Sequence, residues 1–66
     1  MLRNSREIIR RLEQDGFEHV ATAGSHHKYR NPRSRRVVIV PHPKSDIPIG
    51  TVKSIYKQAG WLRQEG

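Results

Sequence analysis

The feature that most constrains this chain is the run VVIV at positions 37–40, because consecutive β-branched residues favour a strand over a helix. A basic segment precedes the run and Pro41 follows it, so we expect a strand over residues 36–40. Every side chain of the run is apolar, which is typical of a strand in a central, well-covered position. The segment from Pro41 to Lys44 must then be a connection, since proline cannot donate a hydrogen bond to a central strand.

Two further segments have strand character and lie before this run. Residues 17–22 are predicted to form one strand and residues 26–31 another, with a turn at residues 23–25. A second turn is expected at residues 31–34, where asparagine, proline and serine cluster. The three strands are short and closely spaced, which favours antiparallel pairing.

The first helical segment has recognisable signals at both ends. Asn4 can cap its start, and Glu7 three residues later completes a capping-box pattern. Gly16 accepts the positive φ of a helix end, and Phe17 would then pack against Leu12 in a Schellman motif. The apolar stripe of this helix consists of Ile8, Ile9 and Leu12.

A second helix is predicted near the carboxyl end. Pro48 is expected at or near its first turn, where a missing N–H is tolerated. Gly60 ends it in the manner of Gly16, with Trp61 in the place of Phe17. The residues at helical spacing are Val52, Ile55, Tyr56 and Ala59.

The predicted order is α-β-β-β-α, an α+β fold with a three-stranded antiparallel sheet. Two amphipathic helices can cover one face of such a sheet and leave the other exposed. With 66 residues, the chain is expected to form one domain over residues 1–66. We expect functional side chains to point out of the exposed face.

Charge and composition limit the partners and the compartment. Thirteen Lys and Arg against six Asp and Glu give a formal net charge of +7, which favours nucleic acid, an anionic membrane or an acidic protein as partner. No apolar run approaches the roughly 18 residues of a membrane span, and the amino-terminal segment lacks the apolar region of a signal peptide. The absence of cysteine excludes disulfides and thiolate metal sites and fits a reducing compartment. The sequence predicts a soluble cytoplasmic protein.

The segment GSHHKYRNP, residues 24–32, concentrates the chemistry-bearing side chains. Strand alternation places His27 and Tyr29 on one face and His26, Lys28 and Arg30 on the other. Histidine suits proton transfer near neutral pH, and Lys and Arg suit phosphate, so a metal-independent ribonuclease is one hypothesis. If His27 points out of the exposed face, Tyr29 is there too and could stack on a base or be an ordinary strand residue.

Other chemistries fit this segment less well. Because His26 and His27 are adjacent in a strand and face opposite ways, they cannot share a metal ion, and no second Cys or His cluster is available. Ser25 lacks the strand-turn-helix elbow of a serine hydrolase. His19 is interpreted as a surface strand residue, and His42 between two prolines as a structural spacer.

Four pieces of the sequence, in order, match one protein family: SREIIRRLEQDGF, GSHHKYRNP, VVIVPHPKSDI and PIGTVKSIYKQAGW. From about Ser5 to Trp61 the chain resembles the HicA-type toxins, the mRNA interferases of HicA–HicB toxin–antitoxin pairs. The resemblance implies a fold similar to a double-stranded-RNA-binding domain. It also implies an endoribonuclease that cleaves mRNA without metal or small-molecule cofactor and arrests growth. Its partners would be mRNA and a HicB-type antitoxin.

The resemblance also assigns roles to residues of the GSHHKYRNP segment. His27 occupies the place of the family's catalytic histidine, whereas His26 occupies a variable place. The residues expected to contact RNA are Ser25, His26, Lys28, Tyr29 and Arg30. The second proton-transfer group is not identified by the sequence. A non-catalytic double-stranded-RNA-binding module and a component that is inert without its partner remain open, whereas DNA binding is less favoured because no helix-turn-helix spacing is present.

Overall fold

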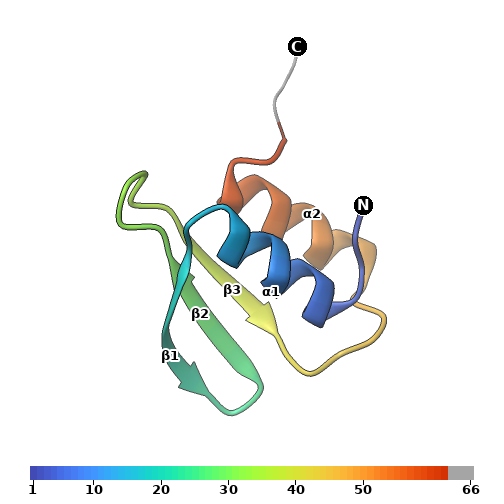
Figure 1. The fold of residues 1–66 in the computed structure, drawn as a ribbon. Helices are drawn as coiled ribbons and strands as arrows, with labels where there is room; N and C mark the ends of the chain where they lie inside the picture. Colours follow the sequence, from blue (N-terminus) through green and yellow to red (C-terminus); the bar gives the residue numbers. More distant parts are fainter. Residues whose placement is uncertain (63–66) are drawn as a thin grey trace.

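The computed structural model describes residues 1–62 and has two helices and three strands (Figure 1). The elements are α1 (Ser5–Gln14), β1 (Glu18–Ala23), β2 (His26–Arg30), β3 (Val37–Pro41) and α2 (Ile49–Ala59). The strands form an antiparallel sheet in the order β1-β2-β3, and both helices lie on one face of it. The predicted α+β class and element order are confirmed. The expected domain also includes residues 63–66, which lie outside the described residues.

The sheet order corrects the position predicted for β3. The central strand is β2, and β3 lies at an edge. Val38 and Val40 are buried under the helices, but Val37 and Ile39 are each 38% exposed on the other face. A β-branched run favours any pleated strand, and it does not report how many neighbours that strand has. The prediction of a central, well-covered strand was therefore wrong.

Pro41 belongs to β3 as its last residue, although it was expected to begin the connection. The Ile39 N–H donates to Oε1 of Gln58 in α2 at 3.3 Å, so it points away from β2. Pro41 lies two residues further on and has the same orientation, where proline loses no hydrogen bond to the neighbouring strand. The edge position of β3 is what makes Pro41 acceptable there.

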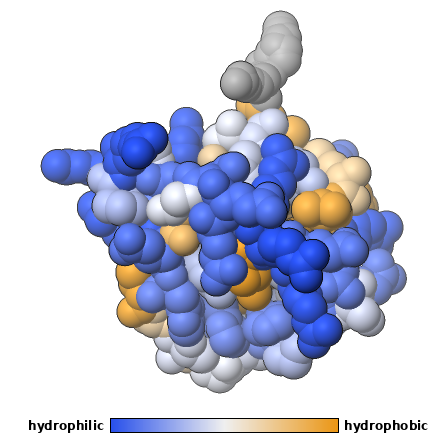
Figure 2. Space-filling model, in the orientation of Figure 1, coloured by the Kyte–Doolittle hydropathy of each residue, from blue (hydrophilic) through white to orange (hydrophobic). Residues whose placement is uncertain are grey.

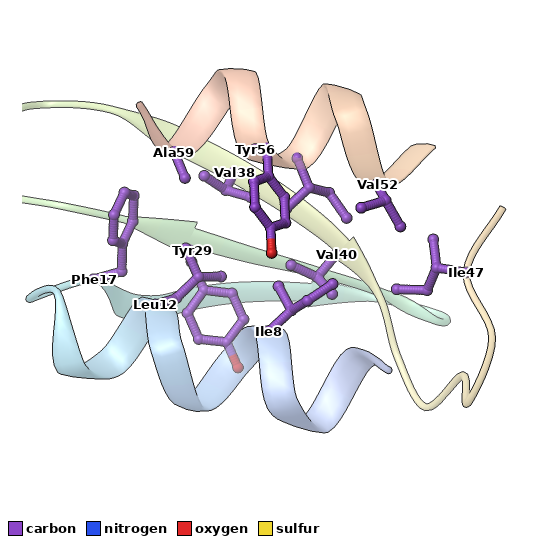
Figure 3. Close-up of a cluster of buried hydrophobic side chains, with 11 residues drawn as sticks. Ile8, Leu12, Phe17, Tyr29, Val38, Val40, Ile47, Val52, Tyr56 and Ala59 are labelled. Carbon is purple, nitrogen blue, oxygen red and sulfur yellow. The ribbon is translucent and has the colours of Figure 1, made fainter. Parts of the chain in front are cut away.

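The core lies between the helices and the sheet (Figure 3). The predicted stripe of α2 is buried along its whole length, and in α1 the stripe is buried except for Ile9, which lies at the margin. Burial of an aliphatic or aromatic side chain contributes about 1.5–3 kcal/mol, so these residues supply most of the driving force for folding. The core residues are Ile8, Leu12, Phe17, Tyr29, Val38, Val40, Ile47, Val52, Ile55, Tyr56 and Ala59.

The predicted helix ends are confirmed, but among the described residues Glu7 makes no hydrogen bond that would complete the expected capping box. Asn4 Oδ1 accepts a hydrogen bond from the Arg6 N–H at 2.9 Å. At the other end of α1, the Phe17 N–H donates to the Leu12 carbonyl at 2.9 Å, and Gly16 has a φ of +94°. The end of α2 repeats this pattern: the Trp61 N–H donates to the Tyr56 carbonyl at 2.8 Å, and Gly60 has a φ of +79°. Pro48 lies at the N-cap position of α2.

A two-residue turn, Gly24-Ser25, joins β1 to β2, and β1 contains an irregularity. His19 pairs with Tyr29, but the register shifts before Ala21, so that Thr22 pairs with His27. Paired residues in a sheet lie on the same face. The shift therefore places His19 and Thr22 on the helix side of the sheet together with His27.

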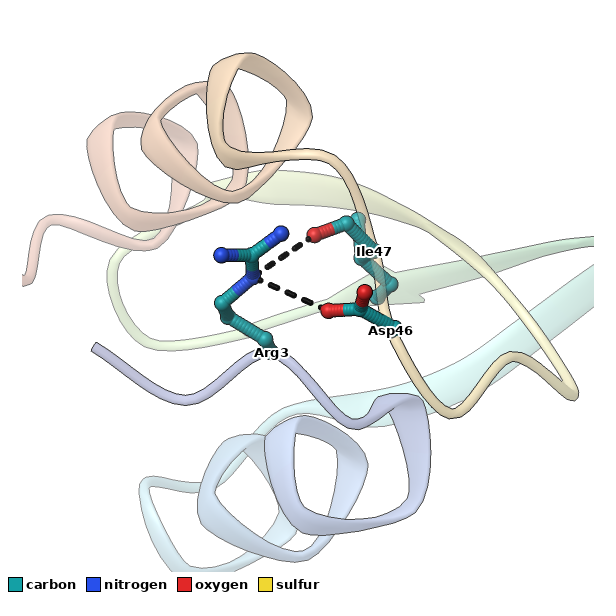
Figure 4. Close-up of polar contacts among 3 residues, drawn as sticks. All are labelled: Arg3, Asp46 and Ile47. Atoms are coloured by element: carbon teal, nitrogen blue, oxygen red, sulfur yellow. Dashed lines mark hydrogen bonds and ion pairs between the residues drawn. The ribbon is translucent and has the colours of Figure 1, made fainter.

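The amino-terminal segment is held against the connection between β3 and α2 (Figure 4). Arg3 Nε donates to the Ile47 carbonyl and to Asp46 Oδ1, each at 3.2 Å. The Ile47 N–H donates to the Arg3 carbonyl, and the Ser5 N–H to the Lys44 carbonyl, both at 2.8 Å. Because Ile47 is also fully buried, these contacts fix the connection beside the start of α1.

The visible surface is mostly hydrophilic, with small separate apolar patches (Figure 2). In the described part of the chain, neither helix has the length and apolar character needed to cross a bilayer.

Candidate active site

His27 lies on the face of the sheet that carries the helices, not on the exposed face. It pairs with Val40, and Tyr29 pairs with Val38; both valines are fully buried. The prediction that His27 and Tyr29 share a face is confirmed, but that face is the covered one. Alternation shows which residues lie on the same side of a strand and cannot show which side the helices cover.

Tyr29 is therefore a core residue. Its side chain is only 4% exposed and is packed with Phe17 and Leu12 in the apolar cluster. Burial, and to a smaller extent the nearby Glu13 carboxylate, raise the pKa of the Tyr29 phenol. Two interpretations of Tyr29 were open, base stacking and an ordinary strand residue, and its burial in the core fits the second and not the first.

His27 differs from Tyr29 because it lies where the helix layer ends. The helices pack against β3, whereas all six residues of β1 are exposed. His27 lies on the strand between them and is half-buried, so one side of its ring contacts protein and the rest is accessible. No hydrogen bond within residues 1–62 occupies either of its ring nitrogens.

Three imidazole rings meet at this margin and form what we call the histidine cluster: His19, His27 and His42. The centroids of His19 and His27 are 5.2 Å apart with nearly parallel rings, and those of His27 and His42 are 5.0 Å apart with the rings edge to face. His19 comes from β1, His27 from β2 and His42 from the connection after β3. On its outer side, His19 Nε2 lies 2.6 Å from Thr22 Oγ1.

The orientation of His42 is set by Ser5. Ser5 Oγ lies 2.7 Å from His42 Nδ1 and accepts a hydrogen bond from the Lys44 N–H at 2.9 Å. Ser5 is 1% exposed, at the first position of α1, so its hydroxyl cannot move far. The Nδ1 atom is thereby engaged, and Nε2 has no protein partner within the described residues.

The pKa of His27 lies below its ordinary value of 6.5. The main cause is partial burial, which disfavours the charged ring, and the positive charges of His42 and His19 add to it. The lowered pKa favours the neutral ring, which can accept a proton and is the state required of a general base.

Two cations adjoin the cluster on the side of α1. Arg6 and Lys44 line a hollow of about 270 Å³ together with Ser5 and His42. A guanidinium and an ammonium group beside proton-transfer groups can stabilise negative charge on a phosphate. The site thus combines a neutral imidazole, a second oriented imidazole and two cations.

The other predicted contact residues lie elsewhere. His26, Lys28 and Arg30 pair with Pro41, Ile39 and Val37 and are exposed on the face opposite to His27. Ser25 and His26 instead line a hollow of about 540 Å³ between β3 and α2, which does not include His27. Ser25 contributes to the histidine cluster only through its backbone, since its carbonyl accepts the His42 N–H at 2.8 Å.

Three histidines close together raise the question of a metal ion. Their rings contact one another by face and edge, and within residues 1–62 no group of three or more His, Cys, Asp or Glu side chains is arranged to hold one.

Sequence reasoning missed most of the surroundings of His27. His42 and Lys44 were interpreted as parts of a connection, and Ser5 and Arg6 as the start of a helix. The long-range contacts that bring these residues together leave no local pattern in the sequence. His19 had no local signal either, because a two-residue turn at Gly24-Ser25 would place Val20 opposite Tyr29. The register shift in β1 brings His19 there instead.

Comparison with known families gives one match. The family model described as HicA toxin of bacterial toxin-antitoxin matches residues 5–61, which include every helix and strand and all three rings of the histidine cluster. No curated protein matches the chain.

Proposed function

The chain belongs to the HicA toxin family of bacterial toxin–antitoxin systems, and from this premise we propose that it is an endoribonuclease that cleaves mRNA. Residues 1–66 form one toxin domain that acts in the cytoplasm without a metal ion, inhibits translation and arrests growth. A HicB-type antitoxin neutralises it. The net charge of +7 suits both an RNA substrate and an acidic antitoxin surface.

The observation that carries the proposal is the state of His27. Its ring is half-buried, its nitrogens have no hydrogen-bond partner within residues 1–62, and its pKa is lowered by burial and by the neighbouring rings of His42 and His19. In RNA cleavage the neutral ring takes the proton of a 2′-hydroxyl, and the 2′-oxygen forms a bond to phosphorus. The bond from phosphorus to the 5′-oxygen breaks, which leaves a 2′,3′-cyclic phosphate and a 5′-hydroxyl end.

Phosphate binding is assigned to cations on the same side of the sheet. Arg6 and Lys44 border the hollow beside His42, where they can contact the scissile phosphate and its neighbour. Lys28 and Arg30 point from the opposite face and attract RNA at longer range. Ser25 and His26 lie in the second hollow, where they can contact RNA that extends from the site.

The test compares two adjacent histidines that face opposite ways. Expression of the wild-type chain is expected to arrest growth and degrade mRNA, whereas His27→Ala should do neither. His26→Ala is the comparison, because it changes the same residue type on the other face of the same strand; it should at most weaken RNA binding and should still cleave mRNA. The proposal fails if His27→Ala still arrests growth and cleaves mRNA while the protein accumulates to the wild-type level.

A non-catalytic double-stranded-RNA-binding module is the alternative function. Its support is the exposed face of the sheet, where Lys28 and Arg30 are available to phosphates but take no part in the reaction above. Such a module would bind RNA with strongly salt-dependent affinity and leave it intact. Purified protein incubated with RNA at low salt separates the two functions, since the ribonuclease yields fragments with cyclic phosphate ends.

A further inference from the structure

His27 and His42 are close enough to act on one phosphodiester group. Their ring centroids are 5.0 Å apart, and the rings meet edge to face. A proton-transfer group reaches its partner atom over about 2.6–3.2 Å. A phosphodiester group that lies against both rings can therefore place its 2′-oxygen near His27 and its 5′-oxygen near His42. Cleavage without a metal ion needs a group at each of these oxygens.

We propose that His42 is the second proton-transfer group of this site and that it protonates the leaving 5′-oxygen. The proposal rests on the ribonuclease function proposed above and supplies the acid that this function leaves unassigned. It changes the interpretation of His42 from a spacer between two prolines to a catalytic residue.

The contact with Ser5 gives His42 the geometry that an acid needs. Ser5 Oγ is 2.7 Å from Nδ1 and has two lone pairs, so it can accept both the Lys44 N–H and an Nδ1–H. In the charged ring, Nδ1–H donates to Ser5 and Nε2–H is left to donate to the substrate. Since Ser5 is buried and its own N–H is bonded to the Lys44 carbonyl, the direction of the ring is fixed before RNA binds.

The step is balanced in atoms and charge. His27 takes the proton of the 2′-hydroxyl as the 2′-oxygen bonds to phosphorus, and it becomes a cation. His42, charged at the start, gives its Nε2 proton to the 5′-oxygen as the bond to phosphorus breaks, and it becomes neutral with its remaining proton on Nδ1. The two histidines exchange charge states, and exchange of protons with water restores them.

His19 is the competing candidate, and its contacts argue for a different role. Its ring is stacked on His27 at 5.2 Å and is exposed, with Nε2 engaged by Thr22 of its own strand. His19 thus has Nε2 already engaged, whereas Nε2 of His42 has no partner within the described residues. His19→Gln is therefore the matched control, since it removes a neighbouring imidazole without removing the acid.

The choice of substitution at position 42 separates folding from chemistry. His42→Asn keeps a polar group near the place of Nδ1, where it can still bond to Ser5, and removes Nε2. Thermal unfolding and circular dichroism are expected to match the wild type. Ser5→Ala is a second variant, in which the imidazole remains but loses its orienting contact. We expect it to retain more activity than His42→Asn.

The experiment uses an RNA oligonucleotide with sulfur in place of the 5′-oxygen at the cleaved bond, which is first mapped on mRNA with the wild-type protein. A thiolate leaves without protonation, so an acid is not needed. On ordinary RNA, His42→Asn should cleave about 10²–10⁴-fold more slowly than the wild type. On the sulfur substrate it should return to within a few-fold of the wild type, whereas His27→Ala should remain slow on both.

The possible failures are distinguishable. If His42→Asn cleaves ordinary RNA at the wild-type rate, or is equally slow on both substrates while folded, the assignment of His42 as the acid is overturned and the ribonuclease proposal stands. If His19→Gln rather than His42→Asn is rescued by sulfur, the acid is His19. If the wild-type protein leaves all RNA intact, the ribonuclease proposal falls and the assignment of His42 falls with it.

Discussion

The Ser5 residue joins the start of α1 to the connection between β3 and α2. It begins α1, its hydroxyl contacts His42, and its backbone and side chain both bond to Lys44. A buried hydroxyl is costly unless it is hydrogen-bonded, and here the partners belong to the candidate site. One small residue thus contributes to stability and to the geometry of the histidine cluster at once.

At the same scale, we predict the titration of His27. The pKa of His27 should lie below 6.5 in the folded protein because of partial burial and the facing rings of His42 and His19. His19→Gln and His42→Asn each remove one positive neighbour, so each should move the pKa of His27 up toward 6.5. Titration of the ring protons by NMR measures this, and an unchanged pKa in both variants would contradict the described cluster.

The lowered pKa of His27 also predicts how the free energy of unfolding changes with pH. The unfolded chain binds a proton near pH 6.5, and the folded chain binds it only at lower pH. The contribution of His27 is therefore present above pH 6.5 and is lost as the pH falls through the folded-state pKa. Relative to its own stability at pH 7, His27→Ala should lose less stability on acidification than the wild type.

Substitutions at Tyr29 distinguish a core residue from a base-stacking residue. Tyr29→Phe keeps the buried ring and should change the free energy of unfolding by about 1 kcal/mol or less. Tyr29→Ala removes the ring and should cost about 3–5 kcal/mol, measured by urea denaturation. If Tyr29 stacked on RNA instead, Tyr29→Ala would impair RNA binding while leaving stability near that of the wild type.

At the scale of elements, local signals settled the helices. The signals that predicted the helices were the glycines at both helix ends, the cap at Asn4 and the apolar spacing of α2. They were sufficient because each depends on residues within one or two helical turns. These features are the part of the fold that the sequence predicts well.

Two glycines, Gly50 within α2 and Gly60 just after its last residue, allow a matched test of backbone conformation. Gly60 has a φ of +79°, and an added Cβ would lie 2.7 Å from Arg36 Nε. The Arg36 side chain can move, so the backbone strain dominates, and Gly60→Ala should cost about 1–2 kcal/mol. Gly50 lies in the first turn with no atom within 4 Å of an added Cβ and no positive φ, so Gly50→Ala should stabilise by about 0.4–1 kcal/mol. Equal effects in thermal unfolding would contradict this account.

Contacts between elements explain what the sequence could not predict. The β-branched side chains of β3 are the same whether that strand is central or at an edge, and alternation in β2 is the same whichever face the helices cover. His42 meets His27 because residues 3–5 and the Ser25 carbonyl hold the connection after β3 in place. The candidate base was therefore identified from the motif, but its face and its neighbours were not.

At the scale of the whole molecule, the thin core makes stability sensitive to a partner. A ligand that binds only the folded state stabilises it by about 2.7 kcal/mol at one hundred times its dissociation constant. We therefore expect a saturating HicB-type antitoxin to raise the melting temperature, by an amount that grows with its concentration. An equal melting temperature with and without antitoxin, measured where complex formation is verified by gel filtration, would refute this.

The contacts of Arg3 and Ser5 with residues 44–47 also bear on how the protein is made. The residues that orient His42 lie 39 to 44 positions after the amino-terminal segment that they contact. During synthesis, His27 is therefore joined to the chain before the residues that hold His42 beside it. Under the proposed function, a nascent chain that ends before these residues lacks the second histidine of the site.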